Sequence, residues 1–93
     1  MDEAEAQRIL DEALRAYQRS SYNELTKLVG QKVHENRVSP TGATYQMDVE
    51  VFWDDKRKGT IRVLGAIDDA SLRYAILPLS QDFIMAPDGS LVG

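Results

Sequence analysis

Residues 43–53, ATYQMDVEVFW, alternate between apolar and polar side chains over almost their whole length. Successive side chains of an extended strand point to opposite faces of a sheet, so this pattern predicts a strand with one buried face. The expected buried face carries Tyr45, Met47, Val49, Val51 and Trp53. The opposite face carries Gln46, Asp48, Glu50 and Phe52.

The segments 60–67 (TIRVLGAI) and 72–79 (LRYAILPL) predict two more strands beside this one. A loop over residues 55–59 places Val51 opposite Val63 and Val49 opposite Gly65. A second turn at Asp69 and Ala70 gives three expected pairs: Ile67 with Leu72, Gly65 with Tyr74, and Val63 with Ile76. Both turns gather apolar residues on one face, which predicts an antiparallel meander in which the ring of Tyr74 covers Gly65.

The first 30 residues predict helix, because apolar side chains recur every three or four positions. The stripe consists of Ala6, Ile9, Leu10, Ala13, Leu14 and Tyr17. We expect a break or kink at Ser20–Ser21, since Ser21 and Glu24 have the spacing of a capping box, and Gly30 is placed to end a second helix. Three acidic residues are expected to favour the positive end of the helix dipole: Asp2, Glu3 and Glu5.

The two ends of the predicted sheet are less regular. Val33 and Val38 in residues 32–38 (KVHENRV) have opposite parity, which predicts a bulge or a register error in the first strand. Near the C-terminus, residues 87–89 (PDG) predict the turn of a hairpin between residues 83–85 and 91–92. Asp82 and Asp88 are poorly spaced for calcium, so no metal site is expected there.

These elements predict an α+β fold in a single domain of residues 1–93, helical over 1–30 and sheet over 31–93. An N-terminal helix, kinked or split in two, would pack on one face of a meander of four or five strands. This outline resembles the cystatin-like and nuclear-transport-factor-like architecture. The resemblance implies dimerisation through the sheet, or a small ligand held between helix and sheet, and it implies no particular functional residue.

Composition excludes several classes of function. The 93 residues contain no cysteine, hence no disulfide framework or thiolate metal site, and the formal net charge is −4. This charge argues against nucleic-acid binding, because the compact basic group, residues 56–58, has the context of a hairpin tip. There is no secretory signal and no apolar run long enough to span a membrane, so we expect a soluble, cytoplasmic protein.

Catalytic chemistry has little support in the sequence. His34 is the single histidine, and no serine lies in a nucleophile-elbow motif. Asp48 and Glu50 share a strand face, where cross-strand pairs with Arg62 and Arg73 are a simpler explanation than acid–base work. The sequence therefore favours a non-enzymatic domain, with no catalytic residue, cofactor or metal.

The second face of the sheet is more informative, because one helical layer covers only one face. Its apolar members are Phe52, Leu64, Ala66, Ala75 and Leu77. A half-apolar exposed face is typical of an interface, so the leading hypothesis is a homodimer or a module that binds another protein. The alternative is a small-molecule pocket between helix and sheet, lined by Tyr17, Tyr45, Trp53 and Tyr74.

Overall fold

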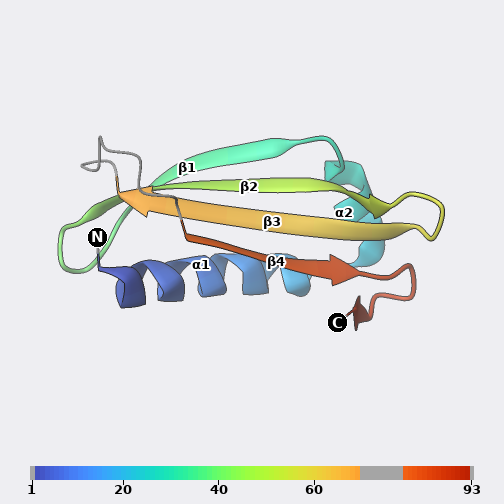
Figure 1. The fold of residues 1–93 in the computed structure, drawn as a ribbon, viewed down its shortest axis with the longest axis horizontal. Coiled ribbons are helices and arrows are strands. Elements are labelled where there is room, and N and C mark those ends of the chain that lie inside the picture. Colours follow the sequence, from blue (N-terminus) through green and yellow to red (C-terminus); the bar gives the residue numbers. More distant parts are fainter. Residues whose placement is uncertain (1, 70–78, 93) are drawn as a thin grey trace.

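The structure is a computed structural model that describes residues 2–69 and 79–92. Its elements are α1 (Glu3–Gln18), α2 (Tyr22–Leu28), β1 (Lys32–Val38), β2 (Thr44–Asp55), β3 (Thr60–Asp69), β4 (Leu79–Met85) and β5 (Leu91–Val92). Each strand pairs antiparallel with the next, in the order β1-β2-β3-β4-β5 (Figure 1). The predicted α+β architecture, with an N-terminal helical region on an antiparallel meander, is confirmed.

The break between the helices follows from local capping. The Ser21 hydroxyl accepts a hydrogen bond from the Glu24 N–H at 3.1 Å, and the Glu24 carboxylate accepts one from the Ser21 N–H at 2.9 Å, so the predicted capping box is confirmed. Gly30 follows α2 with a φ of 88°, and its N–H donates to the Val51 carbonyl at 2.8 Å. This glycine therefore ends the helical region and starts the sheet.

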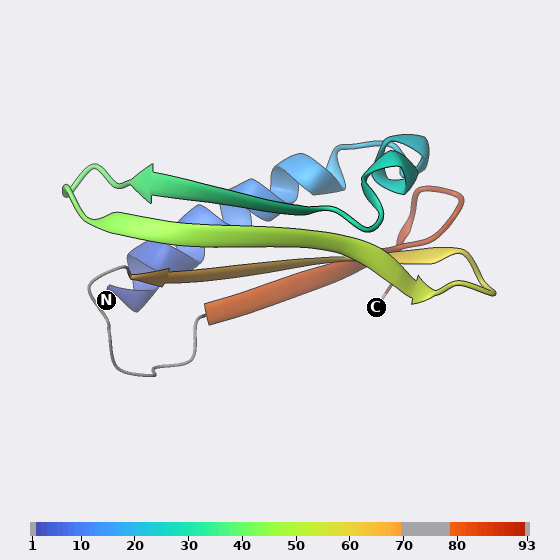
Figure 2. The same cartoon turned by 90° about the horizontal axis from the view of Figure 1, so that it is seen from above.

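The core lies between the helices and one face of the sheet. α1 runs along β3 and β4, and α2 contacts β2 near the other end of the molecule (Figures 1 and 2). The buried strand residues alternate as predicted for β2 and β3, and the helices contribute Ala6, Leu10, Ala13, Leu14 and Leu25. In the described part of the chain, neither helix has the length and apolarity needed to cross a bilayer.

The β2–β3 register was predicted correctly, and the β3–β4 register was predicted wrongly. Val51 lies opposite Val63 and Val49 opposite Gly65, as expected. The strand beyond β3, however, is Leu79–Met85, so Gly65 lies opposite Gln81 rather than Tyr74. The other pairs are Ile67 with Leu79 and Val63 with Phe83 in place of the expected Leu72 and Ile76, which lie outside the described residues with Tyr74.

The reason for a glycine at position 65 is the close approach of α1. A Cβ atom on Gly65 would lie 2.8 Å from Leu10 Cδ1 and 3.1 Å from Leu14 Cδ2, both shorter than a normal contact. Leu10 and Leu14 are buried, so they have little free space in which to move. The glycine thus lets the helix settle onto β3, which is a different role from the predicted cover by an aromatic ring.

The predicted irregularity inside β1 is absent, since its register with β2 is continuous from Lys32 to Val38. Val33 and Val38 lie on opposite faces of this regular strand, which accounts for their opposite parity. Val38 is 71% exposed. At the C-terminus the predicted turn and hairpin are confirmed. Gly89 has a φ of 87°, its N–H donates to the Ala86 carbonyl at 2.8 Å, and Met85 pairs with Leu91.

Candidate functional site

The outer face of the sheet, opposite the helices, carries an apolar strip. Phe52, Leu64 and Ala66 lie on it as predicted from parity, and all three are half-buried. Ile84 and Val92 extend the strip, because Arg62 pairs with Phe52 on one side and with Ile84 on the other, and Ile84 pairs with Val92. We call Phe52, Leu64, Ala66, Ile84 and Val92 the outer strip.

Sequence reasoning missed Ile84 and Val92, because it placed residues 72–79 beside β3. The signal that could have identified Ile84 is its position next to Met85 in a strand, which puts the two side chains on opposite faces of the sheet. Val92 is 48% exposed, so the strip reaches solvent at the C-terminal edge. The remaining predicted interface residues, Ala75 and Leu77, lie outside the described residues.

Acidic side chains surround the outer strip. The carboxylates on this face are Asp48, Glu50, Asp54, Asp68 and Asp82. Within residues 2–69 and 79–92, its lysine and arginine side chains are Lys32 and Arg62. Arg62 bridges two of the carboxylates: Nη2 lies 2.8 Å from Asp54 Oδ1, and Nη1 contacts Asp82. The hydrogen bond with Asp54 raises the pKa of the Arg62 guanidinium, which keeps this cation charged in the centre of the face.

Two of the residues considered for catalysis, His34 and Asp48, are cross-strand partners at solvent-accessible positions of this face. His34 Nδ1 lies 2.6 Å from Asp48 Oδ1, and both side chains are well exposed. Arg62 does bridge strands, but its partners are Asp54 and Asp82 rather than Asp48 or Glu50, and Arg73 lies outside the described residues. Within the described ranges, no group of three or more potential metal-ligating side chains comes together.

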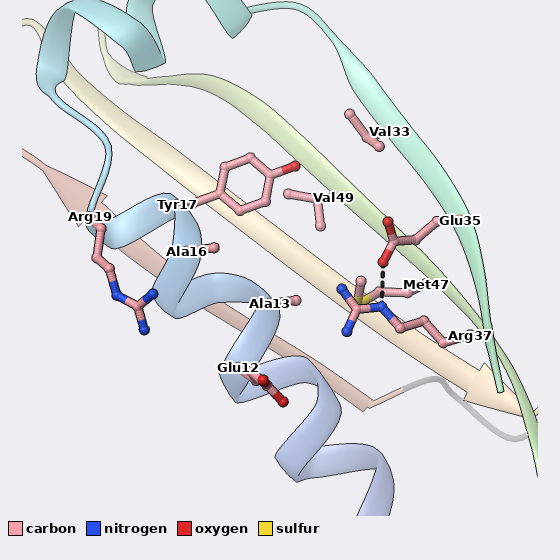
Figure 3. A pocket seen from close by; sticks show the side chains of 10 residues that line it. All are labelled: Glu12, Ala13, Ala16, Tyr17, Arg19, Val33, Glu35, Arg37, Met47 and Val49. Carbon is pink, nitrogen blue, oxygen red and sulfur yellow. Dashed lines mark hydrogen bonds and ion pairs between the residues drawn. The ribbon is translucent and has the colours of Figure 1, made fainter. Parts of the chain in front are cut away.

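A groove separates α1 from β1 and β2 on the inner face of the sheet (Figure 3). Its volume is about 300 Å3, and its apolar lining includes Ala13 on α1 and Val33, Met47 and Val49 on the strands. Glu12 and Arg19 line it from the helix, and Glu35 and Arg37 from β1. Arg37 Nε donates to Glu35 Oε1 at 2.6 Å, so the rim of the groove carries charges of both signs.

One predicted pocket residue, Tyr17, lines this groove and points across it toward β1 and β2 (Figure 3). Its partial burial, together with the negative charge of Glu35, raises the pKa of the Tyr17 hydroxyl. The other predicted residues lie elsewhere: Tyr45 is buried in the core, Trp53 packs against the core, and Tyr74 is outside the described residues. The groove exists because α1 covers β3 and β4 and leaves the β1 side of the inner face open.

A buried carboxylate that was expected only to favour the helix dipole holds α1 to the first hairpin. Glu5 is 7% exposed and accepts hydrogen bonds from the Tyr45 hydroxyl at 2.8 Å and from the Thr41 hydroxyl at 3.1 and 3.2 Å. The bond from Tyr45 lowers the pKa of Glu5, while burial and Glu5 raise the pKa of Tyr45 to about 12. Every acceptor oxygen of this cluster has a partner, so we assign it a structural role.

The outer strip and the inner groove are therefore the two candidate sites, on opposite faces of one sheet. The outer strip extends across β2–β5, which is wide enough for contact with a macromolecule. The inner groove is a recess beside α1. Comparison with family models, curated proteins and solved structures found no match to this chain.

Proposed function

We propose that this chain is a non-enzymatic protein-interaction module that binds its partner through the outer face of the sheet. The observation that carries this proposal is the outer strip, a run of half-buried and exposed apolar side chains on the face opposite both helices. Apolar surface gathered on one face and rimmed by polar groups is characteristic of interaction sites. A cytoplasmic location remains a prediction from the cysteine-free composition.

The charges around the strip favour a basic partner. Three carboxylates beside the strip are Asp48, Glu50 and Asp68. Among the described residues, no lysine or arginine forms an ion pair with any of them, and His34 contacts Asp48. Two copies of this face packed against each other would bring carboxylates together, which opposes association. A partner with basic side chains around an apolar centre would complement it, so we place a different protein, rather than a second copy, on this face.

Site-specific photo-crosslinking in cells would test the proposal. A crosslinker at Ile84, in the strip, is expected to give a discrete adduct with a basic protein, and one at the exposed helix position Arg15 is expected to give none. Leu64→Glu should abolish the Ile84 adduct. It places a third carboxylate between Glu50 and Asp82 and should lower the melting temperature somewhat, so a folded circular-dichroism spectrum at the temperature of the assay is the control. Equal adducts from Ile84 and Arg15, or adducts that persist in Leu64→Glu, would refute the proposal.

A second candidate function is small-molecule binding in the inner groove. Its volume of about 300 Å3 reaches the lower end of the range of ligand sites, roughly 300 to 1,000 Å3, and it combines an apolar lining with a few charged groups. A ligand that binds the folded state raises the melting temperature. Ala16→Phe would fill the groove and remove such a shift, whereas Ala4→Phe, on an exposed part of α1 outside the groove, would preserve it.

A further inference from the structure

β1 forms one edge of the sheet, and its backbone has an open side. Hydrogen-bonded pairs alternate along an antiparallel ladder. Val51 N–H donates to the Gln31 carbonyl at 3.2 Å, and Ser39 N–H donates to the Ala43 carbonyl at 2.8 Å, so the pairs bonded to β2 are those of the odd-numbered residues. The N–H and C=O groups of the even-numbered residues Lys32, His34, Asn36 and Val38 consequently point away from β2.

The backbone of this edge is regular, without a proline or a bulge that would block pairing. β1 has seven residues, a continuous register with β2 and no proline. Edge strands of natural proteins commonly carry prolines, bulges or charged side chains that oppose pairing. The charged side chains here are Lys32 at the start of the strand and Glu35 and Arg37, which have opposite signs. Both of its valines are open to solvent, Val33 at 41% and Val38 at 71%. In the described part of the chain no strand lies on the outer side of β1.

We infer that β1 pairs antiparallel with β1 of a second copy, about a two-fold axis that passes between the two Asn36 residues. The charge pattern selects this register. With Asn36 opposite itself, Glu35 of each copy faces Arg37 of the other, so the ion pair between Arg37 and Glu35 of one copy becomes part of a network of four alternating charges. An axis at Glu35 would place Glu35 opposite itself, and an axis at His34 would place Glu35 opposite Val33, with neither attraction.

The same register agrees with the backbone and with the exposed side chains. Asn36 is one of the residues whose backbone groups point outward, so it can form a hydrogen-bonded pair with its copy. Val38 then lies beside His34 of the second copy, which reduces its exposure. Opposed residues of antiparallel strands share a face, so both helical layers lie on one side and the two inner grooves face each other across the axis.

This inference is independent of the proposed use of the outer strip, because it involves the edge of the sheet. Sedimentation equilibrium of the full chain over a wide concentration range is expected to show a monomer–dimer equilibrium. Asn36→Pro should give a monomer with an unchanged fold, because the Asn36 N–H makes no bond to β2 and proline is tolerated on such an edge. Leu64→Glu should leave the dimer intact.

Charge reversal tests the register itself. Glu35→Lys makes positions 35 and 37 both positive, and Arg37→Glu makes both negative, so each variant alone should dissociate roughly tenfold more readily or worse. An equimolar mixture of the two variants should form a heterodimer, because both cross-strand pairs between positions 35 and 37 then join opposite charges. A monomeric wild-type chain, a dimeric Asn36→Pro variant, or a mixture that stays monomeric while the wild type dimerises would each overturn the inference.

Discussion

Gly65 is the position where the packing of α1 on the sheet can be tested with a single methyl group. A Cβ atom there meets Leu10 Cδ1 at 2.8 Å and Leu14 Cδ2 at 3.1 Å. Adding atoms to a well-packed core costs about 1–3 kcal/mol, while replacing a strand glycine recovers about 0.5–1 kcal/mol of backbone entropy. We therefore expect Gly65→Ala to lower the free energy of unfolding by about 1–2 kcal/mol.

Urea titration and thermal melting of Gly65→Ala would measure this loss. For a domain of this length, about 1–2 kcal/mol corresponds to a fall in melting temperature of roughly 5–15 °C. Ala66→Val is the matched control: it adds volume to the same strand on the outer face, where no helix lies, and we expect a change within about 0.5 kcal/mol. Equal or higher stability of Gly65→Ala would refute the close approach of α1.

A double-mutant cycle identifies the residue that is displaced. Leu10→Ala alone should cost about 2–5 kcal/mol, because it removes a large side chain from the core. In the Gly65→Ala background it should cost less, by about 1 kcal/mol, since the new methyl group occupies part of the vacated space. Strict additivity would show that Leu10 does not contact position 65.

Three further predictions concern the N-terminal ends of α1 and α2 and the side chains that they contact. Hydrogen bonding lowers the folded-state pKa of Glu5. Its contribution to the free energy of unfolding is therefore present above its unfolded-state pKa and is lost as the pH falls through the folded-state pKa. Glu5→Gln should remove this contribution in urea titrations repeated at several pH values. The pKa of Tyr45 is raised from about 10 to about 12, so wild type should lose stability as the pH rises through this window. Tyr45→Phe should lose less, and the remaining loss should come from Tyr17, whose pKa is also raised. Ser21→Ala removes the N-cap of α2 and should cost about 1 kcal/mol. Ser20→Ala serves as its control, because the Ser20 hydroxyl makes only a long, exposed hydrogen bond of 3.5 Å to the Ala16 carbonyl and caps no helix N-terminus.

Local patterns were sufficient to predict two hairpins, the break between the helices and the end of the second helix. The parity of Val49 and Val51 against Val63 and Gly65 fixed the β2–β3 register, because a one-residue slip would expose the whole apolar face. The capping box at Ser21 was equally local. Such signals reside within a few residues of the feature that they specify.

The partner of β3 could not be predicted from parity alone. Residues 72–76 and residues 79–85 both offer apolar side chains that match Val63 and Ile67 across a turn, and the shorter turn was preferred. The contacts of α1 with β4, and the hydrogen bond of 2.6 Å from Gln7 to Gln81, join segments more than 60 residues apart. A pattern read along one strand contains no information about such contacts.

The role of Glu5 was missed for a similar reason. Glu5 lies beside the apolar stripe, immediately before Ala6, and this position was a weak signal that its carboxylate is buried. Its partners, Thr41 and Tyr45, belong to a hairpin 36 and 40 residues away. The hydroxyl-rich turn at residues 39–44 was visible in the sequence, but its distance from α1 was not.

The strictly sequential order of the strands also has a consequence for how the chain folds. The pairing of β2 with β3 closes a loop of only a few residues, so it costs little chain entropy and we expect it to form early. α1 must then return to β3 and β4 from the far end of the chain, and we expect it to dock last. On this order, Gly65→Ala should accelerate unfolding and leave the folding rate almost unchanged, because the contact that it perturbs is absent from the transition state.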